Sequence, residues 1–535
     1  MALTGQVPAT RPNFILILAD DMGFSDLGCF GSEVQTPNLD RLAAGGVRFT
    51  QMYNCARCCP SRASLLTGLY PHQAGVGHMV GNLGIPAYQG YLRDDCVTIA
   101  EALRVDGYRT MLSGKWHCGG VYPRNDPSRW GVGDPKRPIP PDRGFDDWYG
   151  APAGAGSYFN PLPLFRNRTR IEPEGDGYYY TDAVSDEAVR MIGEAAAVDQ
   201  PFFLHVAYTT PHWPLHAVEE DIARYEGKYR QGWDAVRTAR HEELKGMRLL
   251  DPQWEISPRD EKAPPWAEVQ LRDWEDRRMA TYAAQIDRMD QGIGRILAKL
   301  RKLGIEQDTL IVFISDNGGC AELLHEDGRQ VEREWPTTRD GRPITFGNVP
   351  GLMPGDATTY QSYGLPWANA SNTPFRLYKH WVHEGGISTP MIAYWPKGAV
   401  AGGVNHAPAH VIDFMATFLD AAGVAYPEEY NGYAIQPLEG ESLLPALRDK
   451  PWQRQRPIFW EHEGNRAVRD GRWKLVRKYP GAWELYDMVE DRTELNDLAE
   501  KNLPRVAKMA LAYDEWAQRC GVLPWEETLA RMRSE

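Results

Sequence analysis

Four stretches of the chain predict β-strands, and all but the second of them are almost entirely apolar. They are residues 14–19, 108–112, 202–208 and 309–315. A strand of a parallel sheet is covered on both faces, so it reads as a continuous apolar run and does not alternate between polar and apolar positions. We expect two further strands at residues 47–53 and 391–395.

Helical periodicity separates these runs. Between residues 279 and 300 the apolar positions are spaced three and four apart, as on the buried face of a long helix. Shorter helices are predicted at residues 36–45, 97–103, 182–192 and 411–422. Strands that alternate with helices are typical of an α/β fold, so we predict a large, mainly parallel sheet sandwiched by helices.

The pattern changes at about residue 440. Short strands separated by turns are predicted at residues 457–461, 465–469, 473–478 and 484–486, followed by a closing helix at 503–518. Such spacing favours an antiparallel sheet. We therefore divide the chain into a large α/β domain, residues 1–440, and a smaller C-terminal subdomain of antiparallel sheet and helix, residues 441–535.

Three long stretches show little periodicity. Residues 119–180 are rich in glycine, proline and aromatic residues and predict loops, and residues 321–372 are similarly irregular. Residues 215–275 are highly charged and contain several tryptophans, which indicates surface helices and loops. The aromatic side chains in these regions can pack loops or line a substrate pocket, and loop packing is the more common use.

Composition and charge narrow the classes of function. The chain is 42% hydrophobic and 24% charged, as in ordinary globular proteins. Its net charge of −13 argues against nucleic acid or an anionic membrane as a partner. An anionic substrate would need local lysine and arginine side chains to overcome that field. Nothing in the sequence indicates the oligomeric state.

The cysteines and the N-terminal residues bear on the cellular compartment. Eight cysteines in 535 residues are too sparse for a disulfide scaffold. Residues 1–12 lack the charged and apolar regions of an export signal, and no apolar run reaches membrane-spanning length. We expect a cytoplasmic protein with no membrane partner, or a periplasmic one if an export signal was removed.

Polar residues follow each of the four buried strands at its C-terminal end. In chain order they are Asp20 and Asp21, Lys115 and His117, His212, and Asp316 and Asn317. The C-terminal ends of parallel strands share one edge of a sheet, where ligands bind, so we expect these side chains to converge. His205 lies inside its strand and is expected to be a core histidine.

The oxygen-bearing residues of this set favour a hard metal ion. Asp20, Asp21, Asp316 and Asn317 include no histidine or cysteine, which favours Ca²⁺ or Mg²⁺ over zinc. The flexible geometry, together with ligands from a substrate, suits Ca²⁺ better than Mg²⁺. The alternative for the Asp-Asp pair alone is a solvated turn.

Residues 55–68 place a thiol just ahead of the start of a short helix. Pro60 suits a first helical turn and Gly68 can end the helix. Cys58 would then face the free N–H groups at the helix N-terminus, where anions are favoured, and Arg62 would point back to the same place. Alternatives for Cys58 are a structural cysteine, a metal thiolate or a disulfide with its neighbour Cys59.

The run from Cys58 to Gly68 also matches the signature Cys-x-Pro-Ser-Arg-x-x-x-Leu-Thr-Gly, with Cys59 in the first variable position. The chain thus resembles the type I sulfatases, which belong to the alkaline-phosphatase-like superfamily. The resemblance implies that fold, and it implies that a formylglycine-generating maturation enzyme oxidises Cys58 to Cα-formylglycine.

Other segments carry the same resemblance along essentially the whole chain. Gly-Lys-Trp-His at 114–117, Pro-His at 211–212, Glu-Gly-Gly-Ile at 384–387 with Lys379 upstream, and Glu-Leu-Tyr-Asp at 484–487 are similar to family segments. In the family, the Asp-Asp pair matching Asp20 and Asp21 and the Asp-Asn pair matching Asp316 and Asn317 bind Ca²⁺. The chain looks most like bacterial arylsulfatases.

The resemblance implies nucleophilic catalysis by the formylglycine hydrate at position 58. His212, assisted by Lys379, would protonate the leaving oxygen. Lys115, Lys379 and the ion would hold the sulfate oxygens. His117 would take a proton from the second hydroxyl, which ejects sulfate, and Arg62 with Lys115 would orient the hydrate.

The implied function is hydrolysis of a small-molecule sulfate ester, an aryl sulfate, to a phenol or alcohol and inorganic sulfate. Alternatives are a carbohydrate sulfatase, and a phosphonate monoester hydrolase or phosphodiesterase of the same superfamily. A zinc phosphatase would need histidine ligands. A non-catalytic sulfate- or glycan-binding protein would keep an unconverted cysteine at position 58.

Overall fold

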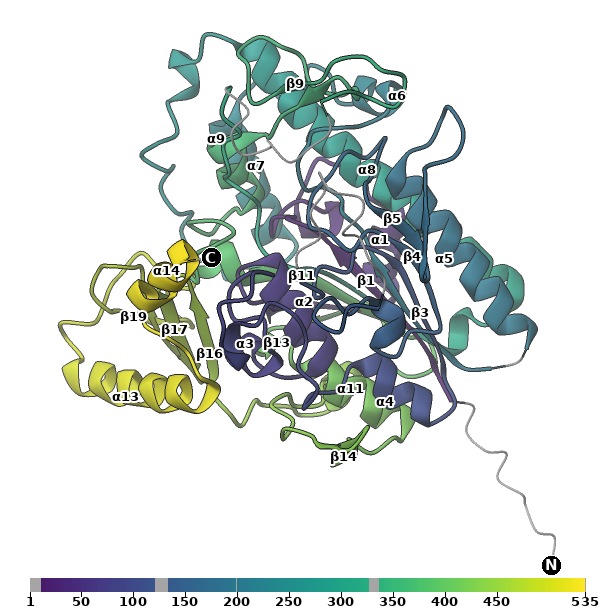
Figure 1. Ribbon diagram of the computed structural model, residues 1–535. Helices are drawn as coiled ribbons and strands as arrows, with labels where there is room; N and C mark the ends of the chain where they lie inside the picture. The colour runs from purple at the N-terminus through teal and green to yellow at the C-terminus, as the bar shows by residue number, and fades with distance from the viewer. Residues whose placement is uncertain (1–10, 121–132, 199, 327–335, 535) are drawn as a thin grey trace, which may run out of the picture.

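The computed structural model describes residues 11–120, 133–198, 200–326 and 336–534, and every structural statement below concerns these residues (Figure 1). One 11-stranded sheet organises the chain. Its order is β12-β2-β11-β8-β1-β7-β3-β4-β5-β6, and β13 pairs with β2. The strands are β1 (Asn13–Ala19), β2 (Val47–Tyr53), β3 (Arg109–Gly114), β4 (Asp147–Gly150), β5 (Leu164–Arg166), β6 (Thr169–Ile171), β7 (Phe202–Ala207), β8 (Thr309–Ser315), β11 (Ser388–Tyr394), β12 (Gly403–Asn405) and β13 (Ala409–His410).

The centre of the sheet is parallel, as the apolar runs predict. β1 lies between β7 and β8 and runs parallel to both, with Leu16 opposite His205 and Val312. Every residue of β1 is buried. β11 is the exception among the central strands, because it runs antiparallel to β8 and β2. The observed fold is the predicted one, a mainly parallel sheet between helices.

Alternate residues of β1 belong to two separate cores. Ile15 and Ile17 pack into the core beneath α1 (Pro37–Gly45), α5 (Tyr180–Ala197) and α8 (Arg272–Leu303). Leu16 and Leu18 pack into the other core. Its helices are α2 (Cys58–Thr67), α4 (Ile99–Val105) and α11 (Asp413–Ala422). Figure 1 shows these two helical layers on opposite faces of the sheet.

Two regions differ from the expectation of loops and surface. Within residues 119–180, β4, β5 and β6 extend the sheet, and β4 pairs parallel with β3. These strands are only three or four residues long, too short to show a period. Residues 215–275 contain α6 (Glu219–Ala223) and α7 (Trp233–Gly246). Trp233 is 1% exposed and packs edge-on against Trp367, so this region contributes to the core.

The C-terminal elements form the predicted antiparallel sheet. Its order is β16 (Ile458–His462), β17 (Asn465–Asp470), β18 (Trp473–Arg477) and β19 (Glu484–Asp487). Helices α13 (Leu503–Cys520) and α14 (Trp525–Ser534) complete this part, drawn in yellow in Figure 1. Lys474 of β18 forms ion pairs of 2.8 Å with Glu384 and 2.7 Å with Glu494, all fully buried. The boundary at residue 440 stays a prediction.

Shorter elements complete the fold: α3 (Pro71–Ala74), α9 (Gly364–Ser371), α10 (Glu384–Ile387), α12 (Leu444–Leu447), β9 (Thr345–Phe346) paired with β10 (Thr359–Tyr360), and β14 (Glu429–Tyr430) paired with β15 (Tyr433–Ala434). Among the helices described, none is both long and apolar enough to cross a membrane. All eight cysteines are buried and form no disulfide. The alternative of a disulfide between Cys58 and Cys59 therefore does not hold in this structure.

Candidate active site

The C-terminal end of β1 presents two carboxylates in an unusual backbone geometry. Asp20 and Asp21 follow Ala19 directly, and Asp21 has φ 66°, in the left-handed region that non-glycine residues seldom occupy. The backbone N–H of Asp20 donates to Thr210 O at 2.9 Å, which fixes the turn against the loop after β7. Such local strain persists where the surroundings enforce it, often at functional sites.

The predicted metal ligands from β1 and β8 meet at this edge. Asn317 Nδ2 donates to Asp21 Oδ1 at 2.7 Å, and the backbone N–H of Asp21 lies 3.3 Å from Asp316 Oδ1. Within the described part of the chain, Asp20 Oδ1 and Asn317 Oδ1 are buried and accept no hydrogen bond. Orphaned buried oxygens are costly, and a hard cation bound by these oxygens would satisfy them. The residues therefore fit a divalent ion.

The pKa shifts of Asp316 and Asp20 also fit the binding of a cation. Burial and the neighbouring charge of Asp20 raise the pKa of Asp316 well above its ordinary value. Burial would also raise the pKa of Asp20, but Lys115, His212 and Arg62 hold it below its ordinary value. Two carboxylates this close destabilise each other's charged forms, and a bound cation would relieve that repulsion.

Three cations balance the three aspartates of the site. The closest contacts join Lys115 Nζ to Asp20 Oδ2 at 2.5 Å, Arg62 Nη2 to Asp316 Oδ2 at 2.7 Å, and Lys379 Nζ to Asp21 Oδ1 at 2.9 Å. All six side chains are buried. Since the three positive and three negative charges cancel, a divalent ion would leave the site with a net charge of about +2. Such a site would attract a sulfate ester in spite of the acidic chain.

Cys58 is the first residue of α2, so the helix begins slightly earlier than the sequence predicts. The helix ends at Gly68, which has φ 69°. Ser61 stabilises the approach to the helix, because its Oγ accepts a hydrogen bond from the backbone N–H of Cys55 at 2.8 Å. Contact with Cys59, together with Lys115 and His117, lowers the pKa of Cys58 well below its ordinary value, although burial opposes this. The position therefore favours negative charge.

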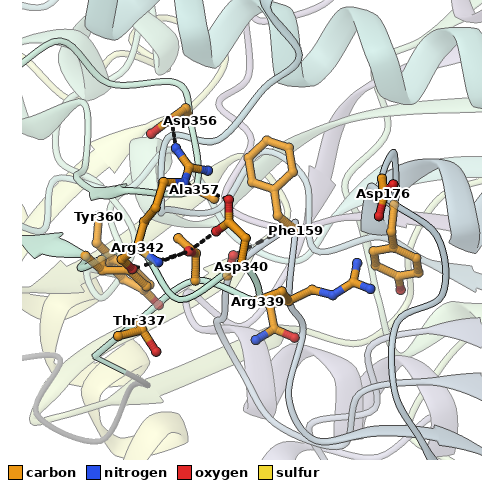
Figure 2. A pocket seen from close by; sticks show the side chains of 14 residues that line it. Phe159, Asp176, Thr337, Arg339, Asp340, Arg342, Asp356, Ala357 and Tyr360 are labelled. Carbon is orange, nitrogen blue, oxygen red and sulfur yellow. Dashed lines mark hydrogen bonds and ion pairs between the residues drawn. The ribbon is translucent and has the colours of Figure 1, made fainter.

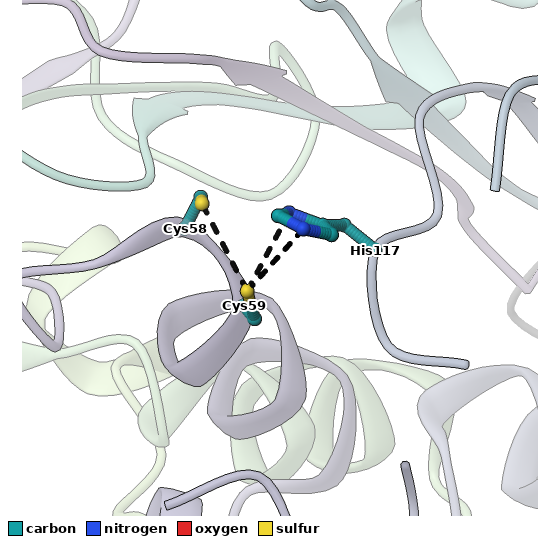
Figure 3. Close-up of side chains that lie close together, drawn as sticks. All are labelled: Cys58, Cys59 and His117. Carbon is teal, nitrogen blue, oxygen red and sulfur yellow. Dashed lines mark hydrogen bonds between the residues drawn. The ribbon is translucent and has the colours of Figure 1, made fainter. Parts of the chain in front are cut away.

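His117 faces both cysteines at the start of α2 (Figure 3). Its Nε2 lies 3.4 Å from Cys59 Sγ, and one of its ring nitrogens lies within 4.8 Å of Cys58 Sγ. His117 has φ 55°, another left-handed position at the site. Burial lowers the pKa of His117 to about 4. The ring is therefore neutral at pH 7 and can accept a proton from a group at position 58.

His212 lies on the other side of the carboxylates. The Nδ1–H of His212 donates to Trp213 O at 2.7 Å, which leaves the lone pair on Nε2. Nε2 is 3.2 Å from Lys379 Nζ and 3.3 Å from Asp21 Oδ2. Burial lowers the pKa of His212, whereas the charges of Asp21 and Glu322 raise that of Lys379 against the effect of burial. Lys379 is thus protonated and can donate a hydrogen bond to His212 Nε2.

Two residues beside the site are absent from the sequence predictions. Arg57 Nη1 pairs with Glu322 Oε1 at 2.8 Å, and Trp213 Nε1 donates to Glu322 Oε2 at 2.8 Å. Glu322 therefore connects the residue before Cys58 to the residue after His212. Arg57 stands next to the cysteine motif, but Glu322 lies in an irregular stretch where no spacing distinguishes it. His205, in contrast, is the core histidine we expect, with Nδ1 donating to Leu16 O at 3.0 Å.

A cavity of about 590 Å³ is lined by residues of the segments 157–178 and 337–360 (Figure 2). Tyr360 lines it, and its ring centroid lies 6.0 Å from that of Trp213, which in turn lies 4.5 Å from that of His212. The other lining residues include aromatic and charged side chains: Phe159, Asp176, Tyr178, Arg339, Arg342 and Asp356. Two ring contacts, His212 with Trp213 and Trp213 with Tyr360, therefore connect the site to the wall of this cavity.

The profile of the sulfatase family matches residues 12–424. The chain belongs to the sulfatase family. A second profile, described as N-sulphoglucosamine sulphohydrolase, C-terminal, matches residues 375–513. The protein is therefore a sulfuric ester hydrolase, and sulfate esters are its substrates.

The relatives of this chain include arylsulfatases. An arylsulfatase of Klebsiella aerogenes is 31% identical over 81% of this chain and 91% of its own length. Arylsulfatase A of Homo sapiens is 27% identical over 88% of this chain and 75% of its own. An uncharacterised sulfatase of Schizosaccharomyces pombe is 30% identical over 94% of this chain and 92% of its own.

Solved structures agree on the fold. Ps i-CgsB, crystallised in complex with k-i-k-neocarrahexaose, has a TM-score of 0.65, 26% identity, and covers 95% of this chain and 93% of its own. The phosphonate monoester hydrolase of Agrobacterium radiobacter has a TM-score of 0.56 and 22% identity, which shows the shared fold alone. This sulfatase therefore has the alkaline-phosphatase-like fold, as predicted. The roles of the site residues stay predictions.

Proposed function

We propose that this sulfatase hydrolyses aryl sulfates, with a formylglycine derived from Cys58 as the nucleophile and Ca²⁺ as the ion. The observation that carries the proposal is the position of Cys58, which opens α2 while Arg62 ties the same helix to Asp316 at 2.7 Å. A group on position 58 is thereby held beside the cation-binding edge of the sheet.

Formylglycine, as its hydrate, supplies one hydroxyl to attack sulfur and a second whose deprotonation releases sulfate. His117 would accept that second proton, because it is neutral and one of its ring nitrogens lies within 4.8 Å of Cys58 Sγ. Arg62 Nη1 donates to the backbone carbonyl of Lys115 at 3.3 Å, so it holds the segment that precedes His117.

Asp20, Asp21, Asp316 and Asn317 would hold Ca²⁺, which supplies positive charge to the sulfate oxygens. Ca²⁺ accepts several carboxylate and amide oxygens in flexible geometry. Lys115 and Lys379 stand beside the same carboxylates and can donate to further sulfate oxygens. Mg²⁺ would require a more regular arrangement.

His212 and Lys379 together can protonate the leaving oxygen. Lys379 Nζ, 3.2 Å from His212 Nε2, can supply the proton that the neutral imidazole lacks. The leaving group would then pass Trp213 towards Tyr360 and the cavity. These aromatic faces suit a phenol, and the arylsulfatase relatives of Klebsiella aerogenes and Homo sapiens support the same substrate class.

A substrate panel tests the proposal. 4-Nitrophenyl sulfate, an alkyl sulfate, a sulfated sugar and 4-nitrophenyl phenylphosphonate, a phosphonate monoester, should be compared by kcat/KM at saturating Ca²⁺. We expect the aryl sulfate to be turned over most efficiently. A sulfated sugar preferred over the aryl sulfate would overturn the proposed substrate, and a phosphonate preferred by a wide margin would contradict sulfate-ester specificity itself.

A further inference from the structure

A second cluster of metal-binding side chains lies outside the active site. Its members are His380, His462 and Glu463, whose candidate ligand atoms all lie within 4.8 Å of one another. His462 ends β16 and Glu463 occupies the turn to β17 with φ 51°. His380 comes from a different part of the chain, directly after Lys379, and has φ 95°. The cluster therefore joins the C-terminal sheet to the segment that carries Lys379.

The spacing of the atoms suits a zinc ion. Glu463 Oε2 lies 2.8 Å from His380 Nδ1, and Glu463 Oε1 lies 3.6 Å from His462 Nε2. Ligands bound tetrahedrally to zinc at about 2.0–2.1 Å are separated from each other by about 3.3 Å. The two measured separations bracket this value, so small side-chain movements would complete the site.

In the described part of the chain, His462 lacks the hydrogen-bond partners that a buried histidine normally has. Its side chain is fully buried, and neither ring nitrogen has a hydrogen-bond partner among the described residues. Buried imidazoles are nearly always partnered, so an unpartnered one needs an explanation. A metal ion bound to Nε2 provides it, because neutral imidazole is a preferred zinc ligand.

His78 is a further partner of Glu463. Its Nε2 lies 3.0 Å from Glu463 Oε1, and its ring stacks on His462 with centroids 5.7 Å apart. Hydrogen bonds of this kind orient carboxylate ligands in metal sites. The nearby positive charge of Arg57 is offset by its 2.8 Å ion pair with Glu322. Solvent has access to the cluster, because the side chain of His380 is 29% exposed.

We propose that His380, His462 and Glu463 bind a zinc ion, with His78 as a positioning residue for the glutamate. The ion would fix the β16–β17 turn to the backbone next to Lys379. The N–H of His380 also donates to Ala56 O at 2.8 Å, in the segment just before Cys58. The zinc site thus connects the C-terminal sheet to both catalytic segments. It does not depend on the proposed substrate.

Calorimetric titration with Zn²⁺ tests this site in the full-length protein. The protein is first treated with a chelator and then saturated with Ca²⁺. We expect one zinc ion per chain, and Co²⁺ in its place should give the intense visible absorption of a four-coordinate nitrogen and oxygen site. Glu463→Gln, which keeps the size of the side chain, and His462→Ala should each weaken zinc binding by about 100-fold or more.

Two further variants separate this site from others. His406→Ala removes an exposed histidine that follows β12 at the edge of the sheet. This variant should leave zinc affinity unchanged. Asp316→Asn alters the active-site oxygens and should also leave it unchanged. Absence of zinc binding by the parent protein, or equal affinity in the parent and Glu463→Gln with both folded by circular dichroism, would overturn the proposal.

Discussion

Lys379 Nζ lies 3.2 Å from His212 Nε2 and 2.9 Å from Asp21 Oδ2. The ammonium group therefore bridges a carboxylate of the cation-binding edge and the imidazole that contacts Trp213. Because His212 Nδ1 donates to a backbone carbonyl, its Nε2 can only accept a hydrogen bond from the lysine while the ring is neutral. This contact connects charge at the ion site to protonation of the leaving group.

Loss of His212 should therefore depend on the leaving group. For His212→Asn we expect kcat to fall roughly 10²–10⁴-fold with phenyl sulfate, whose leaving oxygen needs a proton. The loss should be much smaller with 4-nitrophenyl sulfate, because 4-nitrophenolate leaves readily without protonation. Steady-state kinetics with both esters measures the difference, and an equal loss for both would show that His212 acts in another way.

Removal of the divalent ion should abolish turnover reversibly. Asp20 Oδ1 and Asn317 Oδ1 are buried oxygens without partners in the described part of the chain, so Ca²⁺ should restore activity after chelation better than Mg²⁺. Asn317→Ala should raise the Ca²⁺ concentration for half-maximal activity at least ~10-fold, since even outer-shell groups contribute that much. Asn405→Ala, at the sheet edge, is the matched control. Equal Ca²⁺ dependence in the two variants would contradict the ligand assignment.

Acidification should destabilise the fold through its buried histidines. Burial lowers the pKa of His205 to about 3, so below the ordinary value near 6.5 the unfolded state binds a proton that the native state does not. The stabilising effect of neutral His205 is complete above pH 6.5 and is lost as the pH falls towards 3. The contribution of His205 to the free energy of unfolding should decrease by up to about 2 kcal/mol between pH 7 and pH 5.

His205→Asn tests that contribution. Asparagine can keep the donor to Leu16 O but does not titrate. Urea unfolding at pH 7 and pH 5 should show a smaller pH dependence of the free energy of unfolding in the variant. The same dependence in both proteins would assign the effect to other groups, such as His216, whose pKa burial lowers to about 4.

The C-terminal sheet should depend on a buried ion-pair network. Lys474 lies 2.8 Å from Glu384 and 2.7 Å from Glu494, and all three side chains are inaccessible to solvent. Lys474→Met removes a buried positive charge that is paired with two buried carboxylates. We therefore expect a loss of roughly 3–5 kcal/mol in the free energy of unfolding. Lys397→Met removes an exposed partner of Asp308 and should cost below about 1 kcal/mol. Similar losses in both variants would count against the network.

The sequence predicted the parts of this protein that have a regular pattern. β1, β7 and β8 are buried on both faces, so their composition alone identified them and placed Asp20, His212 and Asp316 at one edge. β4 to β6 escaped prediction because strands of three or four residues have no measurable period.

Contacts between irregular segments could not be predicted in the same way. Glu322 reaches Arg57 and Trp213 from a stretch without periodicity. The charged region before residue 275 looked exposed because the sequence does not reveal that Arg240, 1% exposed, pairs with Asp26 at 2.7 Å. The histidine cluster joins His380 to residues more than eighty positions later, which only the folded chain shows.

The two neighbouring cysteines differ in their surroundings. Cys58 opens α2 beside Lys115 and His117, whereas Cys59 contacts His117 at 3.4 Å and Met79 Sδ at 3.6 Å. We expect Cys58→Ala to abolish turnover with the fold intact. Cys59→Ala should retain activity within about tenfold, with a stability loss of ~1–2 kcal/mol from the small cavity. A fully inactive Cys59→Ala with normal conversion at position 58 would require new roles within the motif.

The central claim concerns the chemical state of residue 58. Mass spectrometry of the tryptic peptide that contains Cys58, from protein that turns over 4-nitrophenyl sulfate, tests it most directly. We predict that the sulfur of residue 58 is replaced by oxygen with loss of two hydrogens, while Cys59 remains a thiol. An intact thiol at position 58 in fully active protein would contradict the account.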